Sequence, residues 1–238
     1  RLVAAIEQSG NPAVGKDAGD VAGIGKTGVV VTDNVQEAQK ADVIIDFTLA
    51  PAVPKNARSA ADHGVAMVIG TTGITETGMK DIWAAAERIP IVHAPNMSLG
   101  VNLLFALVKK AAQVLGQDYS IEIDETHHIH KKDSPSGTAL KIGEKIAEGL
   151  SVDFIENVAC AEGDGSIPDS EKLIKIRSRR EGSVVGDHTA SFENSVERIE
   201  FIHRAHSRDA FAMGAIRAAC WVSGRKPGLY DMQDVLGL

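Results

Sequence analysis

The first hundred residues alternate short apolar runs with stretches of helical character. The apolar runs are continuous and rich in β-branched residues, which is typical of strands buried on both faces of a parallel sheet. Strands are therefore predicted at residues 2–6, 42–47, 65–69 and 89–92, and crossover helices at residues 52–63 and 76–88. This alternation predicts an α/β domain with a Rossmann-like, doubly wound parallel sheet, in which ligands bind at the carboxyl ends of the strands.

The pattern changes after Asn96. Ser98 is a suitable N-cap for a long apolar helix from Leu99 to Leu115. Strict alternation of apolar and polar residues follows, at residues 119–124, 173–177, 183–192 and 198–205. Such alternation predicts a second, α+β domain with a mostly antiparallel sheet. A last helix is predicted at residues 210–222, before a turn-rich tail at residues 224–228.

The composition is that of an ordinary globular protein, with 44% hydrophobic and 24% charged residues in 238. No apolar run approaches the ~20 residues of a membrane span, and we expect no signal peptide. A net charge of −7 argues against a nucleic-acid-binding surface. Cys160 and Cys220 lack metal-type spacing and are expected to be reduced thiols. These features favour a cytoplasmic small-molecule enzyme or binding protein.

Residues 23–28 read GIGKTG and match the dinucleotide fingerprint G-x-G-x-x-G. A genuine fingerprint follows a strand and opens a helix, because the pyrophosphate rests on the helix N-terminus. Here a strand-like run, Val29–Thr32, follows instead, and Asp20 replaces the first glycine of a phosphate loop. We interpret the segment as a surface turn before a short strand.

One polar segment, residues 125–139, concentrates groups that suit catalysis. It lies between a predicted strand and a helix that begins near Gly137, with Ser136 as the N-cap. The backbone N–H groups of Gly137 and Thr138 are then free to bind an anion such as a carboxylate. The absence of a side chain at Gly137 lets a ligand approach the backbone closely.

Positive and titratable side chains lie immediately before this helix start. They are His127, His128, His130, Lys131 and Lys132. Together with the anion site, they suit a carboxylated substrate that is protonated during the reaction. A plain solvent-facing loop is the alternative. A metal cluster is not expected, because no standard ligand spacing such as H-E-x-x-H is present.

The segment from His127 to Ala139, HHIHKKDSPSGTA, resembles the signature of the 4-hydroxy-tetrahydrodipicolinate (dihydrodipicolinate) reductases. Further segments in that family's order and spacing are residues 46–48, 70–73, 94–98, 186–189 and 228–232. The resemblance implies NAD(P)H-dependent reduction of a cyclic imine dicarboxylate on the branch from aspartate semialdehyde to diaminopimelate and lysine. It also implies a cytoplasmic homotetramer built through the sheets of the second domain, with no nucleic-acid or membrane partner.

The resemblance implies that His127 is a proton donor or acceptor and that Lys131 donates a proton to the substrate. His127 shares a strand face with Ile121 and Ile123, so partial burial is expected. Burial and nearby lysines both disfavour a charged imidazole, which favours Lys131 as the protonated group and His127 as a relay. The substrate-binding residues implied are His128, Ser136, Gly137 and Thr138.

On the cofactor side, the resemblance and the strand ends together imply Glu7, Gln8, Gly70, Thr71, Thr72, Ala94, Pro95, Asn96 and Met97 as binding residues. Glu7 closes the first strand and matches the acidic residue that binds the adenine ribose. Gln8 stands where relatives that use NADPH well often have arginine. A carboxylate without an adjacent guanidinium favours NADH over NADPH.

The resemblance assigns residues 1–97 and 208–238 to a dinucleotide-binding domain. It assigns residues 98–207 to a substrate-binding and oligomerisation domain. It also implies a strand, a glycine-rich turn and a helix of roughly 30 residues before Arg1. Because these are absent from the sequence as written, we expect this chain to bind a dinucleotide poorly.

Two other functions are consistent with the two-domain plan. One is a different nicotinamide-dependent dehydrogenase, such as a homoserine or aspartate dehydrogenase. The signature at residues 131–138 argues against it. The other is a non-catalytic binding or regulatory protein. The presence of both His127 and Lys131 argues against it.

Overall fold

The computed structural model describes residues 1–163, 167 and 172–238, and it divides the chain into two compact units. The first unit comprises Arg1–Pro95 and Ala215–Asp231, and the second comprises Asn96–Gly214 and Met232–Leu238. These bounds differ from the predicted domain limits at the C-terminal end, because the last seven residues and the first turns of the helix Asp209–Val222 belong to the second unit.

The first unit is built on a four-stranded parallel sheet in the order β11–β5–β4–β3. Its strands are β3 (Val43–Asp46), β4 (Ala66–Ile69), β5 (Pro90–His93) and β11 (Gly228–Tyr230). All three neighbouring pairs are parallel, and every residue of the central strand β4 is buried. The prediction of a Rossmann-like parallel sheet is confirmed. Strand β11 was not predicted, because the turn-rich tail expected at residues 224–228 reaches only its first residue and no element was assigned to the other two.

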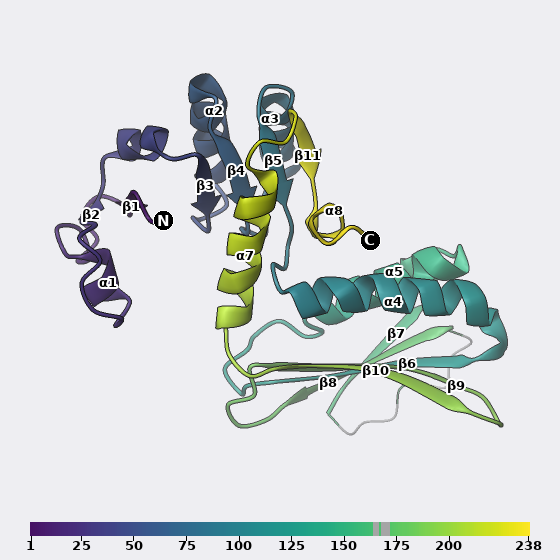
Figure 1. Ribbon diagram of the computed structural model, residues 1–238. Helices are drawn as coiled ribbons and strands as arrows, with labels where there is room; N and C mark the ends of the chain where they lie inside the picture. The colour runs from purple at the N-terminus through teal and green to yellow at the C-terminus, as the bar shows by residue number, and fades with distance from the viewer. Residues whose placement is uncertain (164–166, 168–171) are drawn as a thin grey trace. The chain divides into compact units, whose positions relative to one another are not determined.

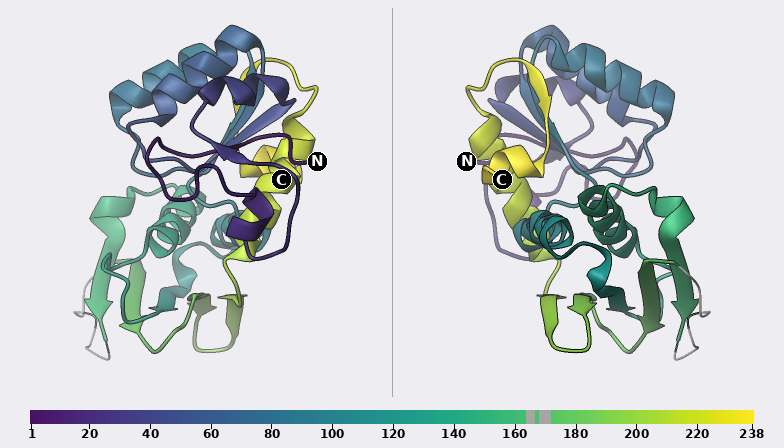
Figure 2. Two further views of the ribbon diagram at one scale, coloured as in Figure 1. Left: turned by 90° about the vertical axis from the view of Figure 1, so that its left-hand side faces the viewer. Right: turned by 90° about the vertical axis from the view of Figure 1, so that its right-hand side faces the viewer.

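Helices cover both faces of this sheet. Figures 1 and 2 show α2 (Val53–His63) and α3 (Glu76–Ala86) on one face and the C-terminal half of α7 (Asp209–Val222) on the other. Helix α2 ends at Gly64, whose φ of 70° lies in the left-handed region that glycine adopts without strain. Helix α3 begins at Thr75, whose hydroxyl accepts from the N–H of Gly78.

The beginning of the chain forms a separate two-stranded parallel sheet, β1 (Ala5–Ile6) with β2 (Val31–Thr32). Helix α1 (Ala18–Val21) lies between these strands, and the 3-10 helix η1 (Val35–Lys40) follows them.

Residues 23–28 form a turn before β2, as predicted, and Asp17 organises this turn. Its carboxylate accepts from the backbone N–H groups of Thr27, Gly28 and Gly19 at 2.8–2.9 Å. These hydrogen bonds, that of Thr27 foremost, lower the pKa of Asp17 to about 2. The glycines therefore serve a turn that is fixed by one carboxylate, rather than a phosphate site.

The second unit contains a five-stranded sheet in the order β10–β9–β6–β8–β7. Its strands are β6 (Ser120–His127), β7 (Val158–Glu162), β8 (Ile174–Arg180), β9 (Gly186–Glu193) and β10 (Arg198–Ala205). The sheet is mixed: β10–β9 and β9–β6 are antiparallel, whereas β6–β8 and β8–β7 are parallel. The α+β plan is confirmed. Strand β7 was not predicted, and it carries Cys160, which like Cys220 is a free thiol.

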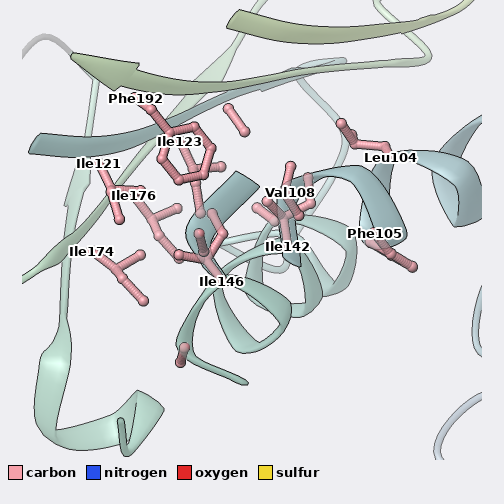
Figure 3. Close-up of a cluster of buried hydrophobic side chains, with 14 of the residues drawn as sticks. Leu104, Phe105, Val108, Ile121, Ile123, Ile142, Ile146, Ile174, Ile176 and Phe192 are labelled. Carbon is pink, nitrogen blue, oxygen red and sulfur yellow. The ribbon is translucent and has the colours of Figure 1, made fainter. Parts of the chain in front are cut away.

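Two helices, α4 (Leu99–Leu115) and α5 (Gly137–Leu150), pack together on one face of this sheet. Figure 3 shows the shared core, in which apolar side chains of strands and helices point toward one another. Its labelled members are Leu104, Phe105, Val108, Ile121, Ile123, Ile142, Ile146, Ile174, Ile176 and Phe192. All are 5% exposed or less, and burial of each such side chain contributes about 1.5–3 kcal/mol. This core holds the end of β6 and the start of α5 in fixed positions.

Helix α4 and the following 3-10 helix η2 (Gly116–Asp118) form one helical stretch of 20 residues, Leu99–Asp118, with a mean hydropathy of 1.3. By length and composition alone, this stretch suffices to cross a membrane. The sequence analysis missed it because Asn102 and two lysines interrupt the apolar run. A core helix meets the same criterion, and the buried face of α4 packs in the core described above. Short helices α6 (Phe154–Asn157) and α8 (Met232–Leu236) complete the second unit.

Candidate active site

The site begins with the alternation of strand β6. Its inward positions are Ile121, Ile123, Glu125 and His127, and all four are buried. The first two belong to the apolar core, whereas the last two bring a carboxylate and an imidazole to the same face. His127 is 8% exposed, which agrees with the expected partial burial. The strand therefore delivers two ionisable groups, two residues apart, at the edge of the core.

Glu125 is the centre of a hydrogen-bond network. Its side chain is 0% exposed. One carboxylate oxygen, Oε2, accepts from Nδ1 of His127. The other, Oε1, accepts from Nη1 of Arg180 at 3.0 Å and from the backbone N–H of Ser136 at 3.2 Å. Burial alone raises the pKa of a carboxyl group, but hydrogen bonds from His127 and Arg180 outweigh it and lower the pKa of Glu125 to about 2. Glu125 is therefore a buried carboxylate at neutral pH.

A second histidine, His188, lies on β9 directly opposite Glu125. Its ring centroid is 5.1 Å from that of His127, and its Nε2 shares a hydrogen bond of 3.2 Å with Oγ of Ser136. Burial lowers the pKa of His188 to about 3, so this ring is neutral. Its Nδ1 has no hydrogen-bond partner among the described residues. His203 lies opposite His188 on β10, with ring centroids 6.4 Å apart.

The start of helix α5 has the predicted geometry. Oγ of Ser136 accepts from the N–H of Ala139 at 3.1 Å, which makes Ser136 the N-cap. The backbone N–H groups of Gly137 and Thr138 have no acceptor within the part of the chain that the structure describes. A Cβ placed on Gly137 would meet nothing within 4 Å. The first turn of α5 thus presents two unpaired N–H donors and open space beside them.

The loop before α5 places its lysines differently. Lys131 is 22% exposed and forms an ion pair with Asp133 at 2.8 Å, whereas Lys132 is exposed. The hydrogen bond from Lys131 lowers the pKa of Asp133. The main-chain carbonyl of Asp133 accepts from Arg180, so the arginine that binds Glu125 also fixes this loop. Nδ1 of His128 is buried and has no partner among the described residues.

A small cavity of about 40 Å³ lies within the second unit, between residues of the helix start and the buried histidines. Its lining includes His127, Thr138, Gly186, His188 and His203. Thr138, in the first turn of α5, therefore borders the same space as the buried histidines.

The expected cofactor residues fall into three groups. Glu7 follows β1, and its Oε1 accepts from the N–H of Gln8 at 2.7 Å. Gly70, Thr71 and Thr72 follow β4, where Oγ1 of Thr71 donates to the carbonyl of Thr48 at 2.7 Å and joins the ends of β4 and β3. Residues 94–97 follow β5, and there Ala94 and Met97 are 2% and 1% exposed, respectively.

Asn96, one of the expected cofactor residues, contacts the start of helix α5. It lies in the second unit, and its Nδ2 donates to Oγ1 of Thr138 at 3.2 Å. Its Oδ1 accepts from the N–H of Ser98, the N-cap of α4. This amide therefore links the starts of helices α4 and α5.

Glu125, His127 and His188 also have possible metal-ligand atoms within 4.8 Å of one another. Both carboxylate oxygens of Glu125 are already engaged by hydrogen-bond donors. In this structure the carboxylate of Glu125 therefore accepts hydrogen bonds from three donors.

Sequence reasoning missed Glu125, Arg180, His188 and His203 as members of this network. Glu125 had a signal, because a carboxylate on the apolar face of a strand two residues before His127 requires a partner. No local sequence signal pointed to Arg180, because its contact with Glu125 depends on the parallel pairing of β6 with β8.

Comparisons with known proteins identify the family of this chain. Residues 1–97 and 100–236 match the families described as dihydrodipicolinate reductase, N-terminus and C-terminus. The 4-hydroxy-tetrahydrodipicolinate reductase of Anaeromyxobacter dehalogenans is 48% identical over 98% of this chain and 87% of its own length. That of Desulfotalea psychrophila is 49% identical over 99% and 88%, respectively.

A solved structure, dipicolinate-bound dihydrodipicolinate reductase from Paenisporosarcina sp. TG-14, is similar with a TM-score of 0.75 and 25% identity, covering 98% of this chain and 88% of that one. The amine dehydrogenase of Mycobacterium smegmatis shares the fold alone, with a TM-score of 0.61 and 13% identity over 96% of this chain and 86% of that one. The matches at both ends of the chain and the identity of nearly half its residues show that it belongs to the dihydrodipicolinate reductase family.

Proposed function

We propose that this chain catalyses the nicotinamide-dependent reduction of 4-hydroxy-tetrahydrodipicolinate to tetrahydrodipicolinate, a step of diaminopimelate and lysine biosynthesis. The observation that carries the proposal is the juxtaposition of an acid–base histidine with unpaired N–H donors at a helix start. Relatives that are nearly half identical carry the name of this activity. A cyclic imine with two carboxylates needs both an anion site and a proton source.

The first turn of α5 holds one substrate carboxylate in this proposal. Gly137 and Thr138 donate their backbone N–H groups to it, and the helix dipole favours its negative charge. Ser136 fixes this turn as its N-cap, and Asn96 orients the hydroxyl of Thr138. His128, which precedes the loop, contributes a further contact with the substrate.

Lys131 and His127 supply the proton. When bound, the nicotinamide cofactor supplies a hydride to an electrophilic carbon conjugated with the imine. The negative charge that develops on the substrate is quenched by a proton from Lys131, whose side chain is 22% exposed. His127, buried and held by Glu125, relays a proton within the site.

The first unit binds the cofactor and the second binds the substrate in this proposal. The ends of strands β1 and β4, at Glu7, Gln8, Gly70, Thr71 and Thr72, and the segment at residues 94–97 form the cofactor side. NADH is the preferred cofactor, because a 2′-phosphate near Glu7 would meet a carboxylate and no guanidinium from Gln8. Specificity constants for the two cofactors test this preference, and equal values would refute it.

Assembly as a cytoplasmic homotetramer through the sheets of the second unit completes the proposal. Analytical ultracentrifugation at micromolar concentration reports the subunit number directly, and a monomer would refute this part. Fractionation of the source cells reports the compartment.

A substrate panel tests the proposed activity. The imine is generated in situ by the preceding enzyme of the pathway. Oxidation of NADH and of NADPH is then followed with the full-length protein as the catalyst. Aspartate and homoserine, assayed in the oxidative direction with NAD and NADP, serve as alternatives from the same two-domain plan. Turnover confined to the imine supports the proposal. Turnover of either amino acid, without turnover of the imine, refutes it.

A further inference from the structure

We propose that Glu125 is a positioning residue that fixes His127 for proton transfer and ties it to the helix start that holds the substrate carboxylate. The inference rests on the proposed function, and it assigns a role to a residue that touches neither substrate nor cofactor. Two features carry it: the Oε2 atom of Glu125 faces the histidine, and its Oε1 atom faces the N-cap of α5.

The first feature sets the tautomer of His127. A carboxylate carries no proton, so the hydrogen bond with Oε2 requires that Nδ1 of His127 be the donor. In a neutral ring, Nε2 is then the free acceptor, and it lies on the side of Gly186. This is the ring nitrogen that remains available for proton exchange. Glu125 thereby leaves His127 one orientation and one reactive nitrogen.

The second feature connects this histidine to substrate binding. Oε1 of Glu125 accepts from the N–H of Ser136 at 3.2 Å, and Ser136 caps the helix whose next two N–H groups are unpaired. One buried carboxylate therefore fixes the distance between the proton relay and the anion site. A shift of either end moves both.

Arg180 makes this buried charge tolerable. It lies opposite His127 on the neighbouring parallel strand β8, and its Nη1 donates to Oε1 of Glu125 at 3.0 Å. A buried carboxylate without a cation is costly, whereas this pair is compensated by charge and by hydrogen bonds. His188 on β9 also packs against the network, and its ring is neutral.

The network predicts the behaviour of the isosteric variant Glu125→Gln. Two donors, Arg180 and the N–H of Ser136, converge on the Oε1 position and hold the amide oxygen of the glutamine there. The amide NH₂ group must then face Nδ1 of His127, which becomes an acceptor, so the ring proton moves to Nε2. The variant inverts the tautomer while it keeps the shape of the site.

The test measures the tautomer and the kinetics of the same proteins. ¹⁵N chemical shifts of the ring nitrogens of His127, assigned by comparison with His127→Gln, distinguish the two tautomers. We expect a protonated Nδ1 in the wild type and a protonated Nε2 in E125Q. We expect kcat to fall by about 100-fold or more in E125Q, with KM for the imine changed by less than about 3-fold, because the anion site keeps its anchor.

Asp124→Asn is the matched control. Asp124 is the preceding residue on the same strand but faces the other side, where it pairs with Arg179 at 3.0 Å. The substitution Asp124→Asn removes the same charge as Glu125→Gln. It is expected to leave the tautomer of His127 and kcat as they are in the wild type. Equal losses in D124N and E125Q would overturn the proposal, because the loss would then reflect the strand and not the network.

The wild-type spectrum alone is also decisive. A His127 ring protonated on Nε2 in the wild type overturns the proposal, whether or not E125Q folds. Unchanged tautomer and turnover in a folded E125Q overturn it as well. A wild type that binds cofactor but does not reduce the imine refutes the proposed function instead, and the tautomer measurement still decides whether Glu125 positions His127.

Discussion

Gly186 lies against the ring of His127: a Cβ at this position would stand 2.9 Å from Nε2. The two residues face each other because β9 runs antiparallel to β6 and brings its first residue to the end of that strand. The neighbour cannot give way easily, since Nδ1 of the same ring is held by Glu125. Gly186 therefore leaves the space that the ring of His127 occupies.

Gly186→Ala should displace the His127 ring, lower kcat by about 10-fold or more and destabilise the fold by about 1–3 kcal/mol, because the added methyl overpacks a buried site. Steady-state kinetics and urea unfolding measure the two effects. In a His127→Gln background the same substitution should cost little further activity, since the two residues act as one unit. Additive losses in kcat would contradict the contact.

Lys131→Met should remove most turnover, by a factor of about 100 to 10,000, while the dissociation constant for NADH stays near the wild-type value. Lys131 is proposed to donate the proton to the substrate, and it has no proposed contact with the cofactor. Lys132→Met is the matched control, because the neighbouring lysine is exposed and forms no ion pair in the described part of the chain. Equal turnover in the two variants would sink the assignment.

Gly137→Ala should separate folding from binding. The protein itself leaves open space where the new methyl would lie, so the free energy of unfolding should change by less than about 0.5 kcal/mol. If a substrate carboxylate approaches the backbone there, KM for the imine and the inhibition constant of dipicolinate should both rise by about 10-fold or more. Unchanged values for both constants would show that the carboxylate binds elsewhere.

Burial lowers the pKa of His188 from its ordinary 6.5 to about 3. Below pH 6.5 the unfolded chain therefore takes up a proton that the folded chain refuses, so stability is greatest above pH 6.5 and falls as the pH drops toward 3. The expected slope from this residue is about 1.4 kcal/mol per pH unit. Burial also lowers the pKa of His93 and of His203, which adds to the slope in the same direction.

Urea unfolding at pH 7, 6 and 5 measures this slope. In His188→Gln the free energy of unfolding should fall less steeply between pH 6.5 and 5 than in the wild type. The slope should be smaller by up to about 1.4 kcal/mol per pH unit. His63→Gln replaces an exposed histidine on α2 and serves as the control. Identical slopes for His188→Gln and the wild type would contradict the burial of a neutral ring.

The pattern of apolar residues was sufficient to predict the elements with strong local signals. The helix Leu99–Leu115 and its cap at Ser98 have the predicted bounds, because a polar cap and a Gly at its end mark both limits. Strand β6 was visible through its strict alternation. In contrast, β7 and β11 are short and carry little periodicity, so only their pairing with longer strands defines them.

The same distinction holds for the site. The N-cap at Ser136 and the burial of His127 follow from local sequence, and both were predicted. The partners of Glu125 were not, because Arg180 is 55 residues away and reaches it through the β6–β8 register. Long-range pairing sets the electrostatics of the network, and no local pattern encodes it.

Reduction of the cyclic imine dicarboxylate is proposed to take place at the end of β6 and the start of α5. The most direct measurement follows NADH oxidation and tetrahydrodipicolinate formation together, with the imine generated in situ, in the wild type and in Lys131→Met. The expected result is one product molecule per NADH oxidised in the wild type and a loss of both signals in the variant. Cofactor binding without product in the wild type, or undiminished product in the variant, would contradict it.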